Sequence, residues 1–305
     1  FWGAGSGIGA AIGPLFGGLI VSGLGWRWVF ALNVPVALAL AAAALRVIAP
    51  DRGHRGAHRF DAAGALLVTL GMAGVVFGII EGRERGWTSA AVLAGFAIGI
   101  ALLVAFARAE RRHPEPLVDL ELLGRRAFAV ANLGGGAVLF VTLGATVYLS
   151  AHLQAEGRTA LGAGLALLPL GVATAVFAAT SGRLTAHISP RTLMLAGLVA
   201  GCAGCVVLSP VPDALWPGLI LLGTGIGLAL PAMTGVALSA APARRTGMAS
   251  AIHNASRQLG ATLGVAVLGT IVLSHTSLAS GLHAALLVAA ATLAAVAVAT
   301  AWLLD

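Results

Sequence analysis

Apolar residues fill this chain in long continuous runs that are separated by short polar segments. A helix that crosses a bilayer needs about 20 predominantly apolar residues. Ten windows of this kind can be marked, at 1–22, 29–48, 62–80, 89–107, 127–150, 160–182, 193–210, 215–239, 247–273 and 281–304. The alternating apolar and polar positions typical of a transmembrane β-strand do not compete with them. The pattern predicts an all-α polytopic membrane protein with about ten transmembrane helices.

The composition supports this fold class. Hydrophobic residues make up 59% of the 305 residues and charged residues 10%, whereas a soluble domain is about 45–50% apolar and about 25% charged. So little polar surface cannot keep a globule in water, which excludes a soluble enzyme and an intrinsically disordered chain. Two cysteines in so long a chain exclude a disulfide scaffold.

All 18 basic residues are arginines, and they concentrate on one side of the predicted membrane. The segments after the second, fourth, sixth and eighth windows carry 13 of them, the other side carries four, and Arg257 lies inside a window. Cytoplasmic loops carry the excess of positive charge, so we expect this side and both chain ends to lie in the cytoplasm, with the spans in the cell (plasma or inner) membrane. Because loop arginines beside spans are a topology signal, the net charge of +7 does not indicate a nucleic-acid partner.

The first window carries small residues at helical spacing. Glycine recurs at every fourth position through Gly5, Gly9, Gly13 and Gly17, which lets two helix backbones approach closely. Pro14 removes a backbone donor and is expected to bend the helix. Generic packing of small residues would explain the same pattern, although an adjacent Gly-Pro pair within it is less common.

The motif Gly9-x-x-x-Gly13-Pro14-x-x-Gly17-Gly18 resembles the antiporter motif on the fifth helix of major facilitator superfamily exporters. The segment from Gly25 to Pro35, with Trp26-Arg27-Trp28-Val29-Phe30 and Asn33, is similar to the next helix joint of the fourteen-helix drug–proton antiporters of the EmrB/QacA type. Further similar segments follow in the family's order, at Asp61–Gly64, Glu81–Trp87, Pro116–Asp119, Arg126–Phe128, Leu161–Pro169 and Gly247–Gly260.

This resemblance implies major facilitator-type helical bundles. Residues 1–48 would form the last two helices of the N-terminal bundle, 49–108 a cytoplasmic loop and two linking helices, 109–126 a cytoplasmic linker and 127–305 a C-terminal six-helix bundle. The chain would then correspond to helices five to fourteen and would lack the first four. The implied activity is proton-coupled efflux of drugs or small amphiphilic metabolites by alternating access. The implied partners are a lipophilic substrate, protons and the lipid bilayer, without a cofactor.

The acidic residues bear on how protons would be coupled. Every Asp and Glu lies in a loop or at the edge of a window, as Asp61, Glu81 and Glu156 illustrate. The windows therefore offer no carboxylate at mid-membrane depth that could take up and release a proton. A proton-driven protein of this type is expected to carry its coupling carboxylate upstream.

Arg257 is the charge that lies deepest in a predicted span. Placing it there costs about 2.5 kcal/mol or more, so it should face a cavity or a partner. Asn254, Arg257 and Gln258 share one helix face, and His253 lies four residues before Arg257. This face is either the polar wall of a substrate cavity, or Arg257 reaches towards the cytoplasm and bonds carbonyl groups of a neighbouring helix.

The window 127–150 is a second candidate wall. The resemblance makes it the first helix of the C-terminal bundle, which would line the central cavity with Asn132, Phe140 and Tyr148 around a break at Gly134–Gly136. Aromatic groups with few polar anchors suit a greasy, loosely specific pocket. For Thr142 and Thr146 we favour hydroxyls that bond to their own helix backbone.

The loop from Gly182 to Arg191 resembles the second copy of the family's cytoplasmic gate motif, with Gly182, Arg183 and Arg191 in place. It departs from that motif at Ala186 and His187, which would weaken a charge relay that locks the gate. A tight basic turn that obeys the positive-inside rule explains the loop equally well.

Other chemistry is not supported by the sequence. Cys202-x-x-Cys205 has no second ligand pair, so we expect packing rather than a metal site. Neither a Walker motif nor a Ser-His-Asp pattern is present, and we expect a transporter rather than an enzyme. Two rival interpretations remain open: a truncated, non-transporting remnant of such a transporter, and a membrane-embedded enzyme acting on lipids, which would need a catalytic cluster near a span end.

Overall fold

The computed structural model describes residues 9, 13, 16–47, 61–112, 118, 120–210, 215–242 and 245–304. The helices in this part of the chain are α2 (Arg27–Val47), α3 (Ala62–Arg85), α4 (Ala90–Glu110), α5 (Leu120–Gly124), α6 (Arg126–Ala155), α7 (Ala160–Leu184), α8 (Pro190–Leu208), α9 (Leu215–Ser239), α10 (Thr246–Leu273) and α11 (Leu278–Leu303). Among the described residues, nine helices, all of these except α5, are long and apolar enough to cross a membrane. They confirm nine of the ten predicted windows. The first window is described only in part, and residues 16–23 are helical there.

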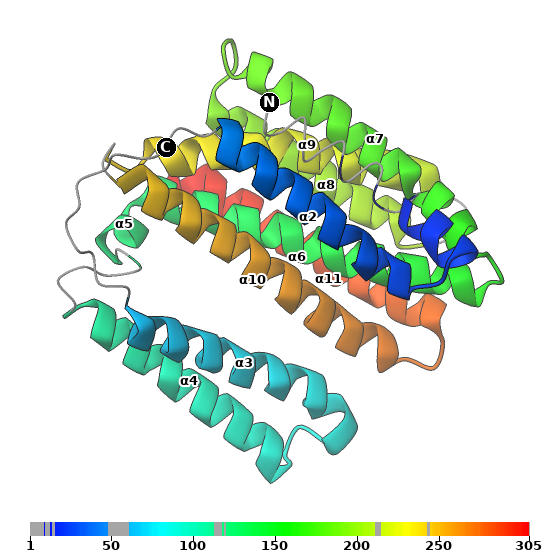
Figure 1. The fold of residues 1–305 in the computed structure, drawn as a ribbon, viewed down its shortest axis with the longest axis horizontal. Helices are drawn as coiled ribbons and strands as arrows, with labels where there is room; N and C mark the ends of the chain where they lie inside the picture. The colour runs from blue at the N-terminus through cyan, green and yellow to red at the C-terminus, as the bar shows by residue number, and fades with distance from the viewer. Residues whose placement is uncertain are drawn as a thin grey trace.

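Helices α6 to α11 pack into one bundle (Figure 1). Helices α6 and α9 are its central pair, because α6 packs on α9, α10 and α11, and α9 packs on α7 and α8. Helix α10 therefore lies on the α6 side of the bundle and α7 on the α9 side, while α8 and α11 pack against each other behind them. This layout leaves one face made of α7, α9, α6 and α10.

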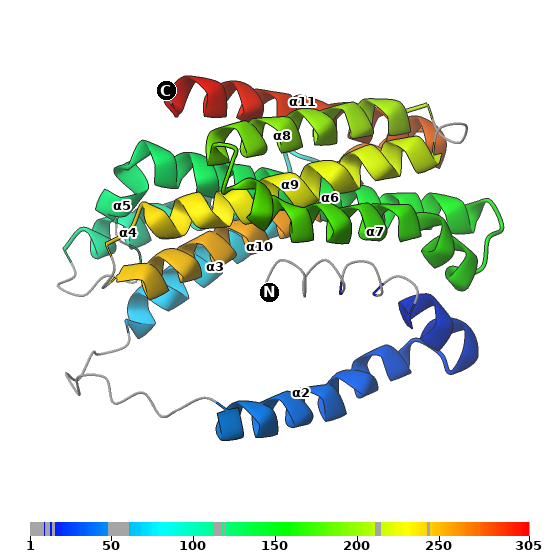
Figure 2. The ribbon, with the colours of Figure 1, turned by 90° about the horizontal axis from the view of Figure 1, so that it is seen from above.

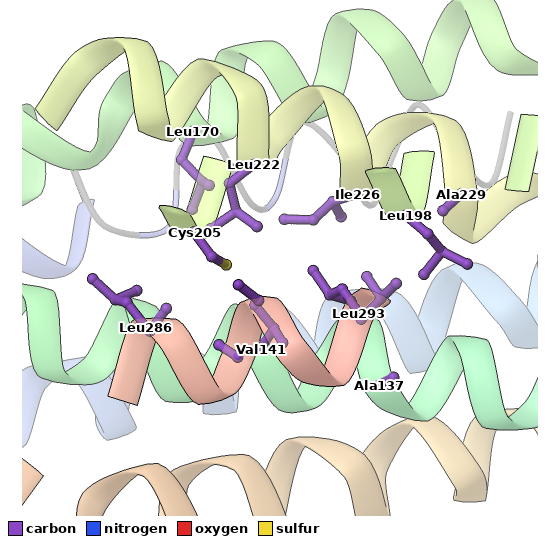
Figure 3. Close-up of a cluster of buried hydrophobic side chains, with 14 of the residues drawn as sticks. Ala137, Val141, Leu170, Leu198, Cys205, Leu222, Ile226, Ala229, Leu286 and Leu293 are labelled. Carbon is purple, nitrogen blue, oxygen red and sulfur yellow. The ribbon is translucent and has the colours of Figure 1, made fainter. Parts of the chain in front are cut away.

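The interior of the bundle is apolar and tightly packed. Side chains from α8 and α9 meet those from α6 and α11, as Leu222, Ile226, Val141 and Leu293 show in Figure 3. Glycines bring the helix backbones together where α8 crosses α9. A Cβ added to Gly225 would lie only 2.5 Å from the carbonyl oxygen of Gly197. Without a hydrophobic drive between helices in lipid, such close approach is a main source of helix association.

Local signals set where the helices end. At the end of α6, Gly157 has φ of +91°, and the amides of Gly157 and Arg158 donate back to the carbonyls of Gln154 and Leu153 at 3.0 and 3.1 Å. This is a Schellman motif, which needs a left-handed residue that glycine supplies without strain. Thr159 then caps α7 by accepting the amide of Gly162. The chain thereby reverses within four residues.

Helices α3 and α4 form a separate hairpin held by glycines. A Cβ on Gly99 would lie 2.8 Å from the carbonyl oxygen of Gly71, and one on Gly74 would lie 2.9 Å from that of Gly95. The hairpin lies beside α10 (Figure 1). Arg83 ties it there by donating to the carbonyl of Leu273, at the last residue of α10, at 3.1 Å.

Helix α2 stands apart from the bundle (Figure 2). It has no buried residue, although its apolar side chains are those of a membrane span. Between its terminal arginines, α2 therefore exposes apolar side chains on all sides, with Asn33 as the polar exception.

Candidate functional site

One face of α10 is polar and exposed along most of its length. Gly247, Ser250, Asn254, Gln258 and Thr262 follow one another at intervals of three or four residues, and all five are exposed. Residues at this spacing lie on one side of a helix. We call this face the α10 polar stripe. A helix that crosses a membrane cannot present such a stripe to lipid without cost.

The opposite face of α10 is fixed by backbone contact with α6. A Cβ added to Gly260 would overlap the carbonyl oxygen of Gly136, and one added to Gly264 would overlap that of Phe140. These contacts cannot be relieved by moving a side chain, because the obstructing atoms belong to the backbone. They therefore set the rotation of α10 about its own axis, and with it the direction of the polar stripe.

A cavity of about 660 Å³ lies between α9 and α10. It runs from the first turn of α10 to the middle of the helix. Its lining consists of Thr234, Leu238, Gly247, Ser250, Ala251, His253, Asn254 and Arg257. The volume lies within the range of about 300–1,000 Å³ that is usual for small-molecule pockets. We call it the α9–α10 cavity.

His253 and Arg257 are held together against α6 by a single glycine. A Cβ added to Gly135 would lie 2.8 Å from Cε1 of His253 and 3.1 Å from Cγ of Arg257. The His253 side chain is only 3% exposed, and its Nε2 lies 3.2 Å from Oγ1 of Thr234. Its Nδ1 is buried without a hydrogen-bond partner in the described part of the chain. A buried imidazole and a guanidinium thus border the same cavity.

Sequence reasoning missed part of this cavity. It named Asn254 and Arg257 as candidates but left out Thr234, which lies on another helix. His253 was noticed only for its spacing to Arg257. The glycine run around Gly135 was the available signal, since small residues in succession mark a place where bulky groups of a neighbouring helix come close.

The run at Gly134–Gly136 does not break its helix, contrary to expectation. Helix α6 continues through it without interruption. Each glycine instead accommodates a neighbour: Met233 against Gly134, His253 against Gly135 and the Ser256 carbonyl against Gly136. The hydroxyls of Thr142 and Thr146 in the same helix donate to the carbonyls four residues earlier at 2.6 Å, which confirms that they bond to their own backbone.

The remaining candidates on α6 do not join the α9–α10 cavity. Asn132 and Phe140 line a separate cavity of about 530 Å³ between α6 and α10, on the side towards α11. Asn132 is 5% exposed and donates to the Phe128 carbonyl at 2.7 Å, while its Oδ1 has no partner among the residues described. The six candidates therefore fall on different surfaces rather than in one pocket.

Tyr148 lies in a third cavity, of about 320 Å³, together with residues of α3 and α10. Its hydroxyl donates to the carbonyl of Val265 at 3.1 Å. A Cβ on Gly269 would overlap that hydroxyl, so only glycine leaves room for the ring. Tyr148 thus links α6 to α10 near the end where Arg83 attaches the α3–α4 hairpin.

The gate loop between α7 and α8 is a tight turn. Arg183 is exposed, and so is Gly182, whose carbonyl accepts the hydroxyl of Thr185 at 2.8 Å. Arg191 differs, because it donates to the carbonyl of Ala301 at 2.7 Å. That carbonyl belongs to the last turn of α11, which lacks partners within its own helix. Arg191 therefore fastens the start of α8 to the end of α11.

The glycine motif of the first window is described only in part, and Pro14 lies outside the described residues. Gly9 and Gly13 are exposed and Gly17 is half-buried, and a Cβ on any of the three would meet no atom within 4 Å. Gly18 is different, since its Cβ would lie 2.9 Å from the carbonyl oxygen of Ala160. Close backbone approach thus occurs at Gly18, where the helical segment 16–23 contacts the first turn of α7.

Acidic groups lie at helix ends wherever the structure describes them. Asp61 caps α3 by accepting the amide of Gly64 at 2.8 Å, Glu81 pairs with Arg85 in the last turns of α3, and Glu156 caps α6.

The part of the chain that is described contains no group of three His, Cys, Asp or Glu side chains that could hold a metal ion. Cys202 and Cys205 are free thiols, and Cys205 is fully buried in the bundle core.

Comparison with known proteins agrees with this architecture. Residues 1–265 and 127–305 match the family model described as the Major Facilitator Superfamily. The chain is 35% identical over 284 residues to the multidrug resistance protein Stp of Mycobacterium tuberculosis, covering 90% of this chain and 52% of that protein.

Two further relatives come from Streptomyces. The puromycin resistance protein pur8 of Streptomyces alboniger is 36% identical, with 90% of this chain and 56% of that protein covered. The tetracenomycin C resistance and export protein of Streptomyces glaucescens is 31% identical, with 90% of this chain and 52% of that protein covered. The chain thus spans little more than half the length of these relatives. From the family match and the bundle of membrane-spanning helices together, the chain belongs to the Major Facilitator Superfamily.

Proposed function

We propose that this chain is part of a fourteen-helix drug–proton antiporter, which exports lipophilic drugs or small amphiphilic metabolites in exchange for protons. The α10 polar stripe carries the proposal. Asn254 and Gln258 are exposed on a helix that crosses the membrane, where a polar face is stable only towards a water-filled cavity or another helical bundle. The relatives support the same function, since their names describe resistance to, or export of, antibiotics.

The expected orientation places the α9–α10 cavity at the cytoplasmic side. The segment that joins the two helices carries Arg244 and Arg245, and positive charge favours the cytoplasmic face. The cavity begins at the first turn of α10 next to that segment. A substrate would thus enter from the cytoplasm and reach the middle of the membrane beside Arg257.

Alternating access needs a second body against which this bundle moves. The helical segment 16–23 would belong to that second body, together with α2. Its contact with the bundle is made by Gly18 on the first turn of α7, where two backbones touch with no long side chain between them. We propose that this contact is the pivot on the outer side, and that α6 to α11 rock as a unit about it.

Transport by the intact polypeptide tests the proposal. The protein is reconstituted into liposomes, a pH gradient is imposed and ethidium movement is followed by fluorescence. We expect transport that stops when nigericin collapses the gradient. Arg257→Ala should lower the initial rate at least about tenfold, because an ionisable side chain inside a membrane span marks a functional site and Arg257 lines the cavity wall beside His253. Arg111→Ala is the matched control, since Arg111 is exposed beyond the end of α4.

Three results would contradict the proposal. Ethidium movement that is unaffected by the pH gradient would remove the proton coupling. Equal effects of the two arginine substitutions would mean that Arg257 reaches out of the membrane and has no part in the cavity. An intact wild-type polypeptide without any transport would favour the remnant interpretation.

A further inference from the structure

The α3–α4 hairpin is joined to the bundle where α3 and α10 end. Arg83 donates to the carbonyl of Leu273 at 3.1 Å, and the hydroxyl of Thr270 lies 3.5 Å from the carbonyl oxygen of Ile79. A cavity of about 320 Å³ remains beside these two contacts. We call it the α3–α10 cavity. Because packed helices leave few voids larger than a water molecule, a space of this size between two helices is expected to hold an occupant.

Most of the wall of the α3–α10 cavity is apolar. Its aliphatic and small residues are Val76, Ile80, Val265, Ala266, Gly269 and Leu273. The hydroxyl groups on the same wall already have partners, since Thr262 donates to the carbonyl of Gln258 at 3.0 Å and Tyr148 to that of Val265 at 3.1 Å. Helices α3 and α10 are both candidate membrane spans, so this wall lies at the depth of the lipid chains. It therefore suits an acyl chain better than water.

The remaining part of the lining carries one positive and one negative charge. Arg83 and Glu84 both line the cavity and are exposed. Glu81 and Arg85, in the same turn, pair with each other instead. Arg83 uses its Nε for Leu273, whereas its terminal nitrogens and the Glu84 carboxylate have no hydrogen-bond or ion-pair partner among the described residues. The cavity thus presents a cationic donor and an anionic acceptor on adjacent residues.

We propose that the α3–α10 cavity binds one phosphatidylethanolamine molecule. The phosphate oxygens of this lipid accept from the guanidinium of Arg83, a group whose planar donors match a phosphate, and its ammonium donates to the carboxylate of Glu84. One acyl chain runs between α3 and α10 along Val76 and Val265. Arg83 and Glu84 stand in the last turn of a span, which is the level of the lipid headgroups. The inference is independent of the proposed efflux.

Other membrane lipids match the two charges less well. Phosphatidylcholine has the same phosphate and a positive charge, but its quaternary ammonium has no N–H to donate to Glu84. Phosphatidylglycerol has no positive charge at all, so its phosphate would bind Arg83 and leave the Glu84 carboxylate without a counter-ion. A free phosphate lacks the acyl chain that the apolar wall accommodates. A primary ammonium next to a phosphate is therefore the feature that the site selects.

Three lipids with identical chains separate these possibilities. Binding of dioleoyl phosphatidylethanolamine, phosphatidylcholine and phosphatidylglycerol to the intact polypeptide in detergent micelles is measured by native mass spectrometry. We expect the first phosphatidylethanolamine to bind at least about tenfold more tightly than either of the others, because each of them forgoes a charge-assisted hydrogen bond to Glu84.

Matched substitutions in the last turns of α3 assign the effect to individual side chains. Glu84→Ala should remove the preference for phosphatidylethanolamine, whereas Glu81→Ala, which removes the same charge from a residue outside the cavity lining, should keep it. Arg83→Gln should weaken binding of all three lipids alike, since each has a phosphate. Arg85→Gln, also outside the lining, should leave their binding unchanged.

The wild-type comparison decides the question without a variant that has to fold. Equal affinities for the three lipids mean a general lipid annulus and overturn the site. Tighter binding of phosphatidylglycerol also overturns it and identifies a site for anionic lipids. Loss of the preference in both glutamate variants would attribute it to net charge rather than to the cavity. Ethidium transport on the same preparation is a separate readout, because a protein without transport can still select the lipid and a transporting protein can fail to do so.

Discussion

The contact between α8 and α9 gives the sharpest test of how this bundle is held together. Gly225 lies where the two helices cross, and its substitution by alanine adds one methyl group. That Cβ would be 2.5 Å from the carbonyl oxygen of Gly197 and 2.5 Å from the amide nitrogen of Gly201. Both obstructing atoms are backbone, so no rotamer change relieves the overlap. The helices must separate instead.

The required movement sets the size of the effect. Ordinary van der Waals contact begins at 3.4 Å, so the two backbones have to move apart by about 0.9 Å from the 2.5 Å that the structure leaves. In a close-packed core such overpacking costs about 1–3 kcal/mol. For a bundle of this length, that cost lowers the melting midpoint by about 2–12 °C. Gly235→Ala is the control on the same helix, because a Cβ there meets nothing within 4 Å.

Unfolding of the bundle can be followed through Cys205, so no further cysteine has to be introduced for labelling. Cys205 is fully buried in the core (Figure 3), and it follows Gly201 of this contact by four residues on α8. After Cys202→Ala it is the single remaining cysteine of the chain. Its reaction with a thiol-sensitive fluorescent dye during heating reports unfolding of the bundle. We expect Gly225→Ala to melt clearly below the parent and Gly235→Ala at or above it, since alanine favours a helix over glycine. Equal midpoints for the two variants would refute the argument from backbone contact.

Two further substitutions address the contacts at the bundle ends. Gly18→Val should slow ethidium export several-fold at equal protein level, because the Cβ that it adds would lie 2.9 Å from the first turn of α7, while Gly17→Val, whose Cβ would lie in open space, should not; similar rates would exclude a pivot at Gly18. Arg191→Gln should lower the melting midpoint by the equivalent of about 1–2 kcal/mol, since it gives up a charge-assisted hydrogen bond to the last turn of α11. Arg183→Gln removes an exposed charge and should leave the midpoint unchanged, and a matching loss there would point to net charge instead.

The sequence alone determined the helices and their membrane character. Runs of about 20 apolar residues have few alternatives, because every backbone polar group in lipid must be bonded within its own helix. The window 215–239 coincides with α9, and the window 247–273 differs from α10 by one residue. Spacing on a single helix was also readable, as it was for Asn254 and Gln258 on the polar stripe.

Contacts between helices were decided only by the tertiary structure. Asn132 and Asn254 look alike in the sequence as polar residues inside apolar windows, yet one is buried beside α11 and the other is exposed on the stripe. Thr234 entered the cavity although nothing near it in the sequence marks it, because its partner His253 lies on the next helix. Periodicity tells which residues share a face, whereas the rotation of that face depends on where a neighbour can approach. For α10 that rotation is set by backbone contact with α6 at Gly260 and at the other small residues that face α6. A pattern of glycines in the sequence does not reveal which of them lies against the backbone of a neighbouring helix.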